Sequence, residues 1–286
     1  MKITNQFKYT SNDYHAPCEI YYHDKLKFII QLPKPTDINE IQYRGDIMSI
    51  YITGSIHGCC GDIHGEPKRF DSKNLLSKDL NITANDVVII CGDFGMPWYN
   101  PWSEEEKSCL EWLEKKPFTI LFIDGNHENF DLLNQFPVIE KFGGKVHQLK
   151  NNIFHLMRGE IFEIQGKTFF TFGGATSTDK DWRTAHVSWW QEENFSSTEF
   201  ENAINNLEKV DFAVDYVITH TAPARFVDSV PEAVERIKDC KTSMLLSDLE
   251  PMLKYKKWFF GHFHIDYYRE DSISAWMSEE IQKILD

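Results

Sequence analysis

The sequence predicts a layered α/β domain in which short apolar strands alternate with amphipathic helices. Six segments are apolar along nearly their whole length, as is typical of strands buried on both faces of a sheet. They are residues 49–53, 86–91, 118–123, 168–172, 215–219 and 258–260. Helical patterns fall between these segments, and this alternation favours an α/β arrangement of sheets and helices.

Two capping boxes mark where helices are expected to begin. Ser103 is followed three residues later by Glu106, and apolar residues at positions 110 and 113 continue the pattern on one helical face. Ser196 and Glu199 repeat the box ahead of apolar positions 200, 204 and 207. The sequence therefore predicts helices that start just after Ser103 and just after Ser196.

Residues 1–47 differ from the rest of the chain. Residues 25–32 could form a strand, which Pro33 and Pro35 would end. Met48 immediately precedes the first strong core strand. We expect one domain over residues 48–286, and two interpretations of residues 1–47 stay open: an added segment, or an upstream extension of the reading frame.

The charge balance argues against one class of partner. Thirty Lys and Arg residues against 44 Asp and Glu residues give a net charge of −14. Such a surface repels polyanions, so non-specific nucleic-acid binding is not expected. A small phosphorylated substrate remains compatible, because bound divalent cations can reverse the sign of the charge within a cleft.

The compartment is expected to be the cytoplasm. The N-terminus becomes polar at once and has no apolar signal core, and no apolar run approaches the ~20 residues that span a bilayer. The six cysteines form no CxxC pair, which favours reduced thiols. No membrane partner is expected, and the sequence leaves the oligomeric state open.

Polar clusters follow five of the expected strands. They are Asp62-Ile63-His64-Gly65, Gly92-Asp93, Gly125-Asn126-His127-Glu128, His220, and Gly261-His262-Phe263-His264. The carboxyl ends of strands in an α/β sheet converge on one crevice, so these side chains are expected to meet. A lone histidine beside a strand is usually structural, but five such clusters in the same register indicate a site.

The residue types in these clusters indicate metal-assisted phosphoryl chemistry. Carboxylate, imidazole and amide oxygen together suit manganese, iron or zinc. A shared carboxylate can bridge two ions roughly 3.5–4 Å apart, which is the spacing of two-metal phosphoryl-transfer sites. Such a pair acidifies a bridging water and neutralises the charge that develops on the phosphoryl oxygens.

The order Asp-x-His, Gly-Asp, Gly-Asn-His-Glu, His, Gly-His-x-His resembles the calcineurin-like metallophosphoesterase superfamily over roughly residues 48–264. The resemblance implies a four-layer β-sandwich of two mixed sheets flanked by helices, with a dinuclear metal site at the strand ends. It implies hydrolysis of a phosphomonoester or phosphodiester by attack of a metal-bridging hydroxide.

The resemblance also assigns site residues by motif. One divalent ion would be held by Asp62, His64, Asp93 and His264, and the other by Asp93, Asn126, His220 and His262, with Asp93 bridging. His127 would act as general acid or as a donor to the scissile phosphate. Glu128 would orient its neighbours without binding metal.

Two departures from the family pattern matter. The second motif continues Phe94-Gly95-Met96-Pro97-Trp98 and lacks the phosphate-gripping arginine of the protein Ser/Thr phosphatases, so a bacterial-type member is expected. The first motif is doubled, because Ser55 and His57 directly follow the strand while Asp62 and His64 come seven residues later. We favour Asp62 and His64, since the chemistry needs the carboxylate.

Several alternatives stay open. Arg183 could grip a substrate phosphate, although an ion pair with Asp179 or Asp181 is favoured. Trp182, Trp189 and Trp190 could stack on a base, although packing is favoured. The chain could also be a catalytically weakened metal-binding or interaction scaffold, or a nuclease, which would need a basic or aromatic channel.

Overall fold

The structure is a computed structural model that describes residues 18–22, 25–30, 48–58, 67–268 and 272–285 of the chain. It divides into two compact units, residues 1–47 and 48–286, each described separately. In the first unit, β1 (Cys18–Tyr22) and β2 (Lys25–Ile30) form an antiparallel hairpin with Cys18 opposite Ile30. The strand expected at residues 25–32 is therefore present over Lys25–Ile30, and residues 31 and 32 lie outside the described residues.

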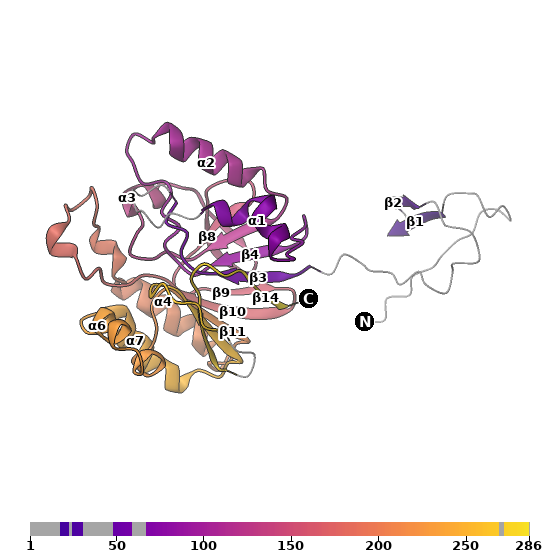
Figure 1. The fold of residues 1–286 in the computed structure, drawn as a ribbon. Helices are drawn as coiled ribbons and strands as arrows, with labels where there is room; N and C mark the ends of the chain where they lie inside the picture. The colour runs from indigo at the N-terminus through magenta and orange to yellow at the C-terminus, as the bar shows by residue number, and fades with distance from the viewer. Residues whose placement is uncertain (1–17, 23–24, 31–47, 59–66, 269–271, 286) are drawn as a thin grey trace. The chain divides into compact units, whose positions relative to one another are not determined.

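The second unit contains the strands and helices of the α/β domain (Figure 1). Its strands are β3 (Ile50–Thr53), β4 (Val87–Ile90), β5 (Thr119–Phe122), β6 (Val138–Lys141), β7 (Gly144–Gln148), β8 (Ile153–Leu156), β9 (Ile161–Ile164), β10 (Lys167–Phe172), β11 (Tyr216–Thr219), β12 (Lys257–Phe260), β13 (Ser274–Trp276) and β14 (Gln282–Leu285). Its helices are α1 (Ser72–Ser77), α2 (Glu104–Glu114), α3 (Phe130–Leu133), α4 (Ser197–Glu208), α5 (Ala224–Val227), α6 (Pro231–Ile237) and α7 (Lys241–Leu249). Short 3₁₀ turns are η2 (Pro67–Phe70), η3 (Lys180–Trp182), η4 (Gln191–Glu193) and η5 (Glu250–Met252).

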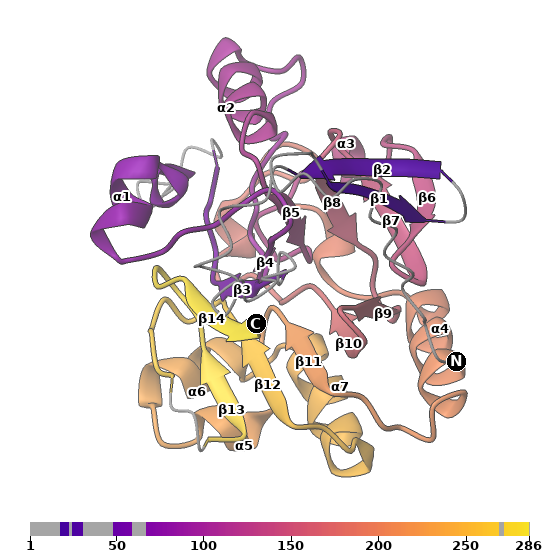
Figure 2. The ribbon, with the colours of Figure 1, turned by 90° about the vertical axis from the view of Figure 1, so that its right-hand side faces the viewer.

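The strands form two mixed sheets. The first has the order β14-β3-β4-β5-β8-β7-β6, in which β3, β4, β5 and β8 run parallel and the strands at both edges are antiparallel. The second has the order β13-β12-β11-β10-β9, in which only the β9–β10 pair is antiparallel. Figure 2 shows β10 to β13 in this order, with α5 to α7 beside them.

Three apolar cores separate four layers. Ile90 of the first sheet packs with Leu110 and Leu113 of α2 in the outer core. Its neighbour Ile89 points the other way and packs with Phe259 of β12 in the core between the two sheets. A third core joins the second sheet to α4, α6 and α7 (Figure 1). The expected sandwich of two mixed sheets flanked by helices is confirmed.

Both expected capping boxes are present. The Ser103 side chain accepts from the backbone N–H of Glu106, whose carboxylate accepts from the backbone N–H of Ser103. Ser196 and Glu199 make the same reciprocal pair at the start of α4. These bonds satisfy backbone donors that the first helical turn leaves without partners, which explains why the two helices begin where the sequence predicts.

Two observations bear on the expected compartment. No helix within the described residues is long and apolar enough to cross a membrane. Cys91, Cys109 and Cys240 are free cysteines, and burial raises the pKa of the Cys91 thiol well above its ordinary value. Cys91 is therefore an inert core residue at neutral pH, as its position at the end of a buried strand suggests.

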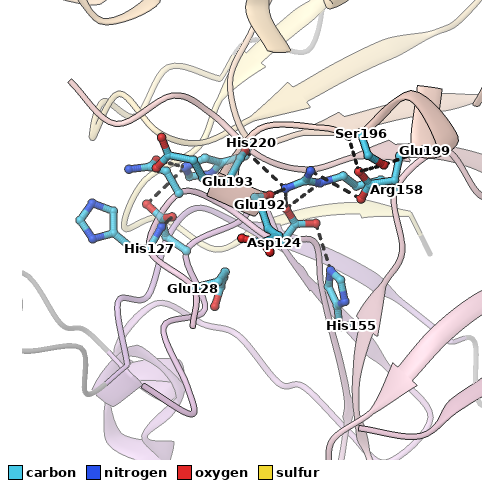
Figure 3. Close-up of polar contacts among 12 residues, drawn as sticks. Asp124, His127, Glu128, His155, Arg158, Glu192, Glu193, Ser196, Glu199 and His220 are labelled. Carbon is cyan, nitrogen blue, oxygen red and sulfur yellow. Dashed lines mark hydrogen bonds and ion pairs between the residues drawn. The ribbon is translucent and has the colours of Figure 1, made fainter. Parts of the chain in front are cut away.

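A buried polar chain supports the loop that follows β5. His147 and His155 face each other across β7 and β8, with their Nδ1 atoms 2.9 Å apart. His155 Nε2 lies 3.1 Å from Asp124 Oδ1, and the same carboxylate accepts from Arg158 Nε at 2.9 Å. Figure 3 shows Asp124 between Arg158 and His155. Since Asp124 stands two residues before Asn126, this chain fixes the start of the third motif.

The pH dependence of the free energy of unfolding should reflect the burial of His147 in this polar network. Burial and the charge of His155 lower the pKa of His147 to about 4, below the ~6.5 of an unfolded histidine. The unfolded state therefore binds more protons between these values, and stability falls as pH drops through them. Urea unfolding of metal-free protein should lose about 2 kcal/mol between pH 7 and pH 5 through His147. His147→Gln should show a shallower decline; an identical slope would contradict the assignment.

Candidate metal centre

The polar clusters lie at strand ends of both sheets. Asp93 follows β4 and Asn126 follows β5 in the first sheet, while His220 follows β11 and His262 follows β12 in the second. His220 Nε2 lies 3.2 Å from Asp93 Oδ2, which joins the two sheets at this point. The structure therefore brings together the loops that the sequence placed at strand ends, and the centre lies where the sheets meet.

Asp93 is the side chain that the other groups surround. Its carboxylate is buried, with Oδ1 accepting from the backbone N–H of His127 at 2.8 Å. Oδ2 lies near the Nε2 atoms of His220 and His57, at 3.2 and 3.7 Å. Burial alone would raise the pKa of Asp93, but the charges of His220, His127 and His57 hold it well below its ordinary value. Asp93 is therefore a carboxylate whose Oδ1 is held by the backbone and whose Oδ2 faces the imidazoles of His220 and His57.

The loops reach this arrangement through an unusually close approach of backbone to side chain. Asp93 has φ = 51°, and Gly92 before it has φ = 90°, a region that glycine adopts without strain. A Cβ atom on Gly92 would lie 2.1 Å from the His220 ring, and one on Gly125 would lie 2.0 Å from Asp93 Oδ1. The glycines that precede Asp93 and Asn126 therefore leave the space in which the ligand side chains sit.

The tautomer of His220 follows from its partners. Its Nδ1 lies 2.8 Å from the backbone carbonyl oxygen of Cys91, which can only accept, so Nδ1 carries the proton. In the neutral ring, Nε2 then presents a lone pair to Asp93 Oδ2 and to Asn126 Oδ1, which is 3.1 Å away. Burial lowers the pKa of His220, but the Asp93 charge outweighs this and raises it. Three electron-pair donors converge here, and such a set requires a proton or a metal cation.

His262 lies beside His220 and is a further candidate donor. Its ring is buried against His220, with centroids 5.0 Å apart. Within the described part of the chain, its Nε2 has no hydrogen-bond partner. Burial and the His220 charge hold the pKa of His262 well below its ordinary value, so the ring is neutral. A buried neutral nitrogen with no protein partner fits a metal ligand, since such groups otherwise lose a hydrogen bond on folding.

A second group of donors, from other loops, also lies near Asp93. His57 and His264 approach through their Nε2 atoms at 3.2 Å. Donor atoms of His57, Asp93 and His127 all lie within 4.8 Å of one another, close enough to share one metal ion. His264 is exposed and His127 is half-buried, whereas His220 and His262 are buried. This side of the centre therefore opens to solvent.

The structure places the first copy of the doubled motif at the centre. The backbone N–H groups of Ile56 and His57 donate to the Asp93 carbonyl at 3.1 and 2.8 Å. Arg69 holds the same loop by donating to the Ser55 carbonyl at 2.8 Å. Ser55 is buried two residues after β3 ends at Thr53, where the family pattern has its first aspartate.

The favoured assignment of the first motif is not resolved by these contacts. Asp62 and His64 lie in residues 59–66, outside the described residues, so their assignment as metal ligands stays a prediction. His57, the alternative ligand from the first copy of the motif, lies beside Asp93 and His264.

Glu128 supports the loops instead of facing the centre. Its carboxylate accepts from the backbone N–H groups of Phe94 and Gly95 at 2.7 and 3.0 Å. Burial and the Asp93 charge raise the pKa of Glu128 well above its ordinary value. This geometry agrees with the expected role of orienting neighbouring residues without binding metal.

The aromatic loop after β10 divides into packed and exposed parts. Arg183 Nε donates to Asp179 Oδ1 at 2.7 Å, so the favoured ion pair is present. The Asp93 charge also contributes to raising the pKa of Arg183, which places the guanidinium within electrostatic range of the centre. Trp190 is buried and its ring N–H donates to Asp131, so the packing favoured for this residue is confirmed. Trp182 is 91% exposed, so packing is the wrong interpretation for it.

Four buried polar residues near the centre were missed by the sequence argument. They are Asp124, Arg158, Ser177 and Glu193. Ser177 follows β10 after Gly173-Gly174, a sixth strand-end loop whose signal resembles that of the recognised clusters. The partners of Arg158 and Glu193 come from distant parts of the chain, so only the fold reveals them.

Comparison with known proteins decides the family. Residues 58–266 match the profile of the calcineurin-like phosphoesterases, which is more than half of the chain. The chain belongs to the calcineurin-like phosphoesterase family. The matched range contains Asp93, Asn126, His220 and His262, together with Asp62 and His64, and it begins one residue after His57.

Individual relatives are more distant. The human and mouse proteins named metallophosphoesterase domain-containing protein 1 are each 26% identical over 207 residues, which cover 66% of this chain. This chain spans 57% of the length of those relatives. A solved phosphopantetheinyl hydrolase from Mycobacterium tuberculosis is 13% identical, with a TM-score of 0.40, covering 82% of this chain and 89% of that one.

Proposed function

We propose that this protein hydrolyses a phosphoester of a small molecule, using divalent cations held around Asp93. The observation that carries the proposal is the convergence of Asp93 Oδ2, His220 Nε2 and Asn126 Oδ1 within hydrogen-bonding distance. With the His220 proton on Nδ1, these atoms present lone pairs to one another. Carboxylate, amide oxygen and imidazole form the donor set that borderline divalent cations prefer.

The donors fall into two pockets that share Asp93. Asn126, His220 and His262 complete the buried pocket with Asp93, and these four residues would hold one cation. His57 and His264 would hold a second cation with Asp93 in the open pocket. We place His57 there because its loop is bonded to the Asp93 backbone. Asp62 and His64, which lie within the range matched by the family profile, stay the alternative ligands of this pocket.

When bound, the two cations would supply an acidified water as nucleophile and positive charge for the phosphoryl oxygens. Manganese, iron and zinc all suit the donor set. The chain's own residues supply orientation and a proton. The backbone N–H of His127 is bonded to Asp93 Oδ1, which fixes the half-buried ring beside His57 with centroids 5.0 Å apart. His127 is therefore placed to donate to the leaving oxygen or to the phosphoryl group.

The substrate is proposed to be small and phosphorylated. A net charge of −14 disfavours nucleic acids and other large polyanions, except where cations reverse the local sign. Arg183 is the proposed phosphate contact, because its charge lies within range of Asp93 and Asp179 restrains its side chain. A cytoplasmic location, expected from the sequence, belongs to the same proposal.

Turnover of chromogenic esters tests the proposal. Purified protein with added Mn²⁺ should hydrolyse a nitrophenyl monoester or diester, and chelation should abolish the activity. His127→Ala should lower kcat by about 10²- to 10⁴-fold, the range for loss of a general acid. Its bound metal, measured by elemental analysis, should be unchanged. Loss of one ion per chain would instead make His127 a ligand together with His57 and Asp93, whose donor atoms lie within 4.8 Å of its own. Full metal occupancy without turnover of either ester in the wild type would instead favour a scaffold, and cleavage of single-stranded DNA a nuclease.

Metal content decides between the two copies of the first motif. His57→Ala should lose the cation of the open pocket, so the number of Mn²⁺ ions bound per chain should fall by one. His64→Ala is the matched control and should keep the wild-type stoichiometry. The opposite pattern would assign the pocket to the second copy and remove His57 from the site.

A further inference from the structure

We infer that Ser177 and Glu193 are positioning residues that set which end of the Asn126 amide faces the metal pocket. Asn126 Nδ2 donates to Ser177 Oγ at 3.1 Å, and Ser177 Oγ donates to Glu193 Oε2 at 2.6 Å. The inference rests on the proposed function, in which Asn126 Oδ1 is a metal ligand. All three side chains are buried, so water does not compete for these bonds.

The direction of the hydrogen bonds starts at Glu193. Its Oε1 accepts from the backbone N–H of Ser177 at 2.9 Å, and its Oε2 accepts from the Ser177 hydroxyl. Burial raises the pKa of Glu193 above its ordinary value, and the two hydrogen bonds from Ser177 oppose that rise. We take Glu193 as the carboxylate that these two bonds favour. A carboxylate can only accept, so the single hydroxyl proton of Ser177 points towards Glu193. The Ser177 oxygen then has only lone pairs to offer to Asn126.

This polarity selects one orientation of the amide. The Nδ2 group of Asn126 can donate to those lone pairs, which directs Oδ1 towards His220 Nε2 at 3.1 Å. Rotating the amide by half a turn would set Oδ1 against Ser177 Oγ, two acceptors in contact with no proton between them. It would also turn an N–H group, which cannot bind a cation, into the pocket.

The turn that carries Glu193 is itself held in place. Arg158 donates to the backbone carbonyl of Glu192 at 2.8 Å while its Nε donates to Asp124 at 2.9 Å (Figure 3). Asp124 begins the loop that carries Asn126. The turn η4 and the Asn126 loop are therefore tied together twice, once through Arg158 and Asp124 and once through the Ser177 chain.

Glu193→Gln should reverse the direction of the hydrogen bond between residue 193 and Ser177. A glutamine can accept from the Ser177 backbone N–H only if its amide donates to Ser177 Oγ, and the hydroxyl proton then turns towards Asn126. We expect Mn²⁺ affinity, measured by calorimetry at fixed pH, to fall by about 10- to 100-fold, as for other outer-shell partners of metal ligands. Glu192→Gln is the matched control, because it removes the same charge from an exposed side chain of the same turn.

A double-mutant cycle separates orientation from a merely structural role. Ser177→Ala should weaken Mn²⁺ binding in the wild-type background. In Asn126→Asp, both carboxylate oxygens are equivalent and no orientation is needed, so Ser177→Ala should cause no further loss. Equal losses in both backgrounds would overturn the inference in favour of general destabilisation.

The possible failures are distinguishable. Wild-type protein that binds no Mn²⁺ would overturn the proposed function and this inference together. Wild-type protein that binds Mn²⁺, alongside Glu193→Gln and Ser177→Ala variants that bind it equally well, would overturn the positioning role alone. Thermal unfolding of the metal-free variants shows whether each remains folded, and the Glu193→Gln variant keeps the test decisive if Ser177→Ala does not fold.

Discussion

The buried carboxylate of Asp93 is the group on which the arrangement of the strand-end loops depends. Removing a carboxylate from water costs several kcal/mol unless hydrogen bonds and opposite charges replace the hydration. Here the replacement comes from the His127 backbone N–H and from imidazoles of both sheets. Because those partners must reach the same few ångströms, the loops before Asp93 and Asn126 carry glycines with no room for a side chain.

The two pockets of the centre differ in how deeply their side chains are buried. His220 and His262 follow β11 and β12 of the second sheet and are buried, so their pocket is closed to solvent. His264 is exposed and His127 is half-buried, so the other side is the route by which a substrate can approach. Ser55 stands where the family pattern supplies a carboxylate, which leaves the open pocket with Asp93 as its one carboxylate among the described residues. We therefore expect the buried pocket to bind its cation more tightly.

The sequence predicted the parts of the fold that local patterns determine. The six apolar segments became β3, β4, β5, β10, β11 and β12, and the two capping boxes start α2 and α4. The remaining strands of this unit were missed. Of these, β6 alternates between exposed and half-buried residues, and β13 spans three residues, so neither presents a continuous apolar run. Their pairing is decided by neighbouring strands and not by their own composition.

The site residues also divide into those that local sequence predicts and those that it does not. Asp93, Asn126, His220 and His262 could be found because each directly follows a recognisable strand. Ser177 and Glu193 could not, because their significance lies in contacts between segments about 50 residues or more from Asn126. The doubled first motif has a different difficulty. Two copies compete for one place, and local sequence does not say how the chain between them folds.

Locating the metals directly tests the central claim that cations are held around Asp93. Crystals grown with Mn²⁺ should show an anomalous difference peak bounded by Asp93, Asn126, His220 and His262. A second peak is expected between Asp93, His57 and His264, weaker if that pocket is only partly filled. No peak near Asp93 at saturating Mn²⁺ would contradict the account.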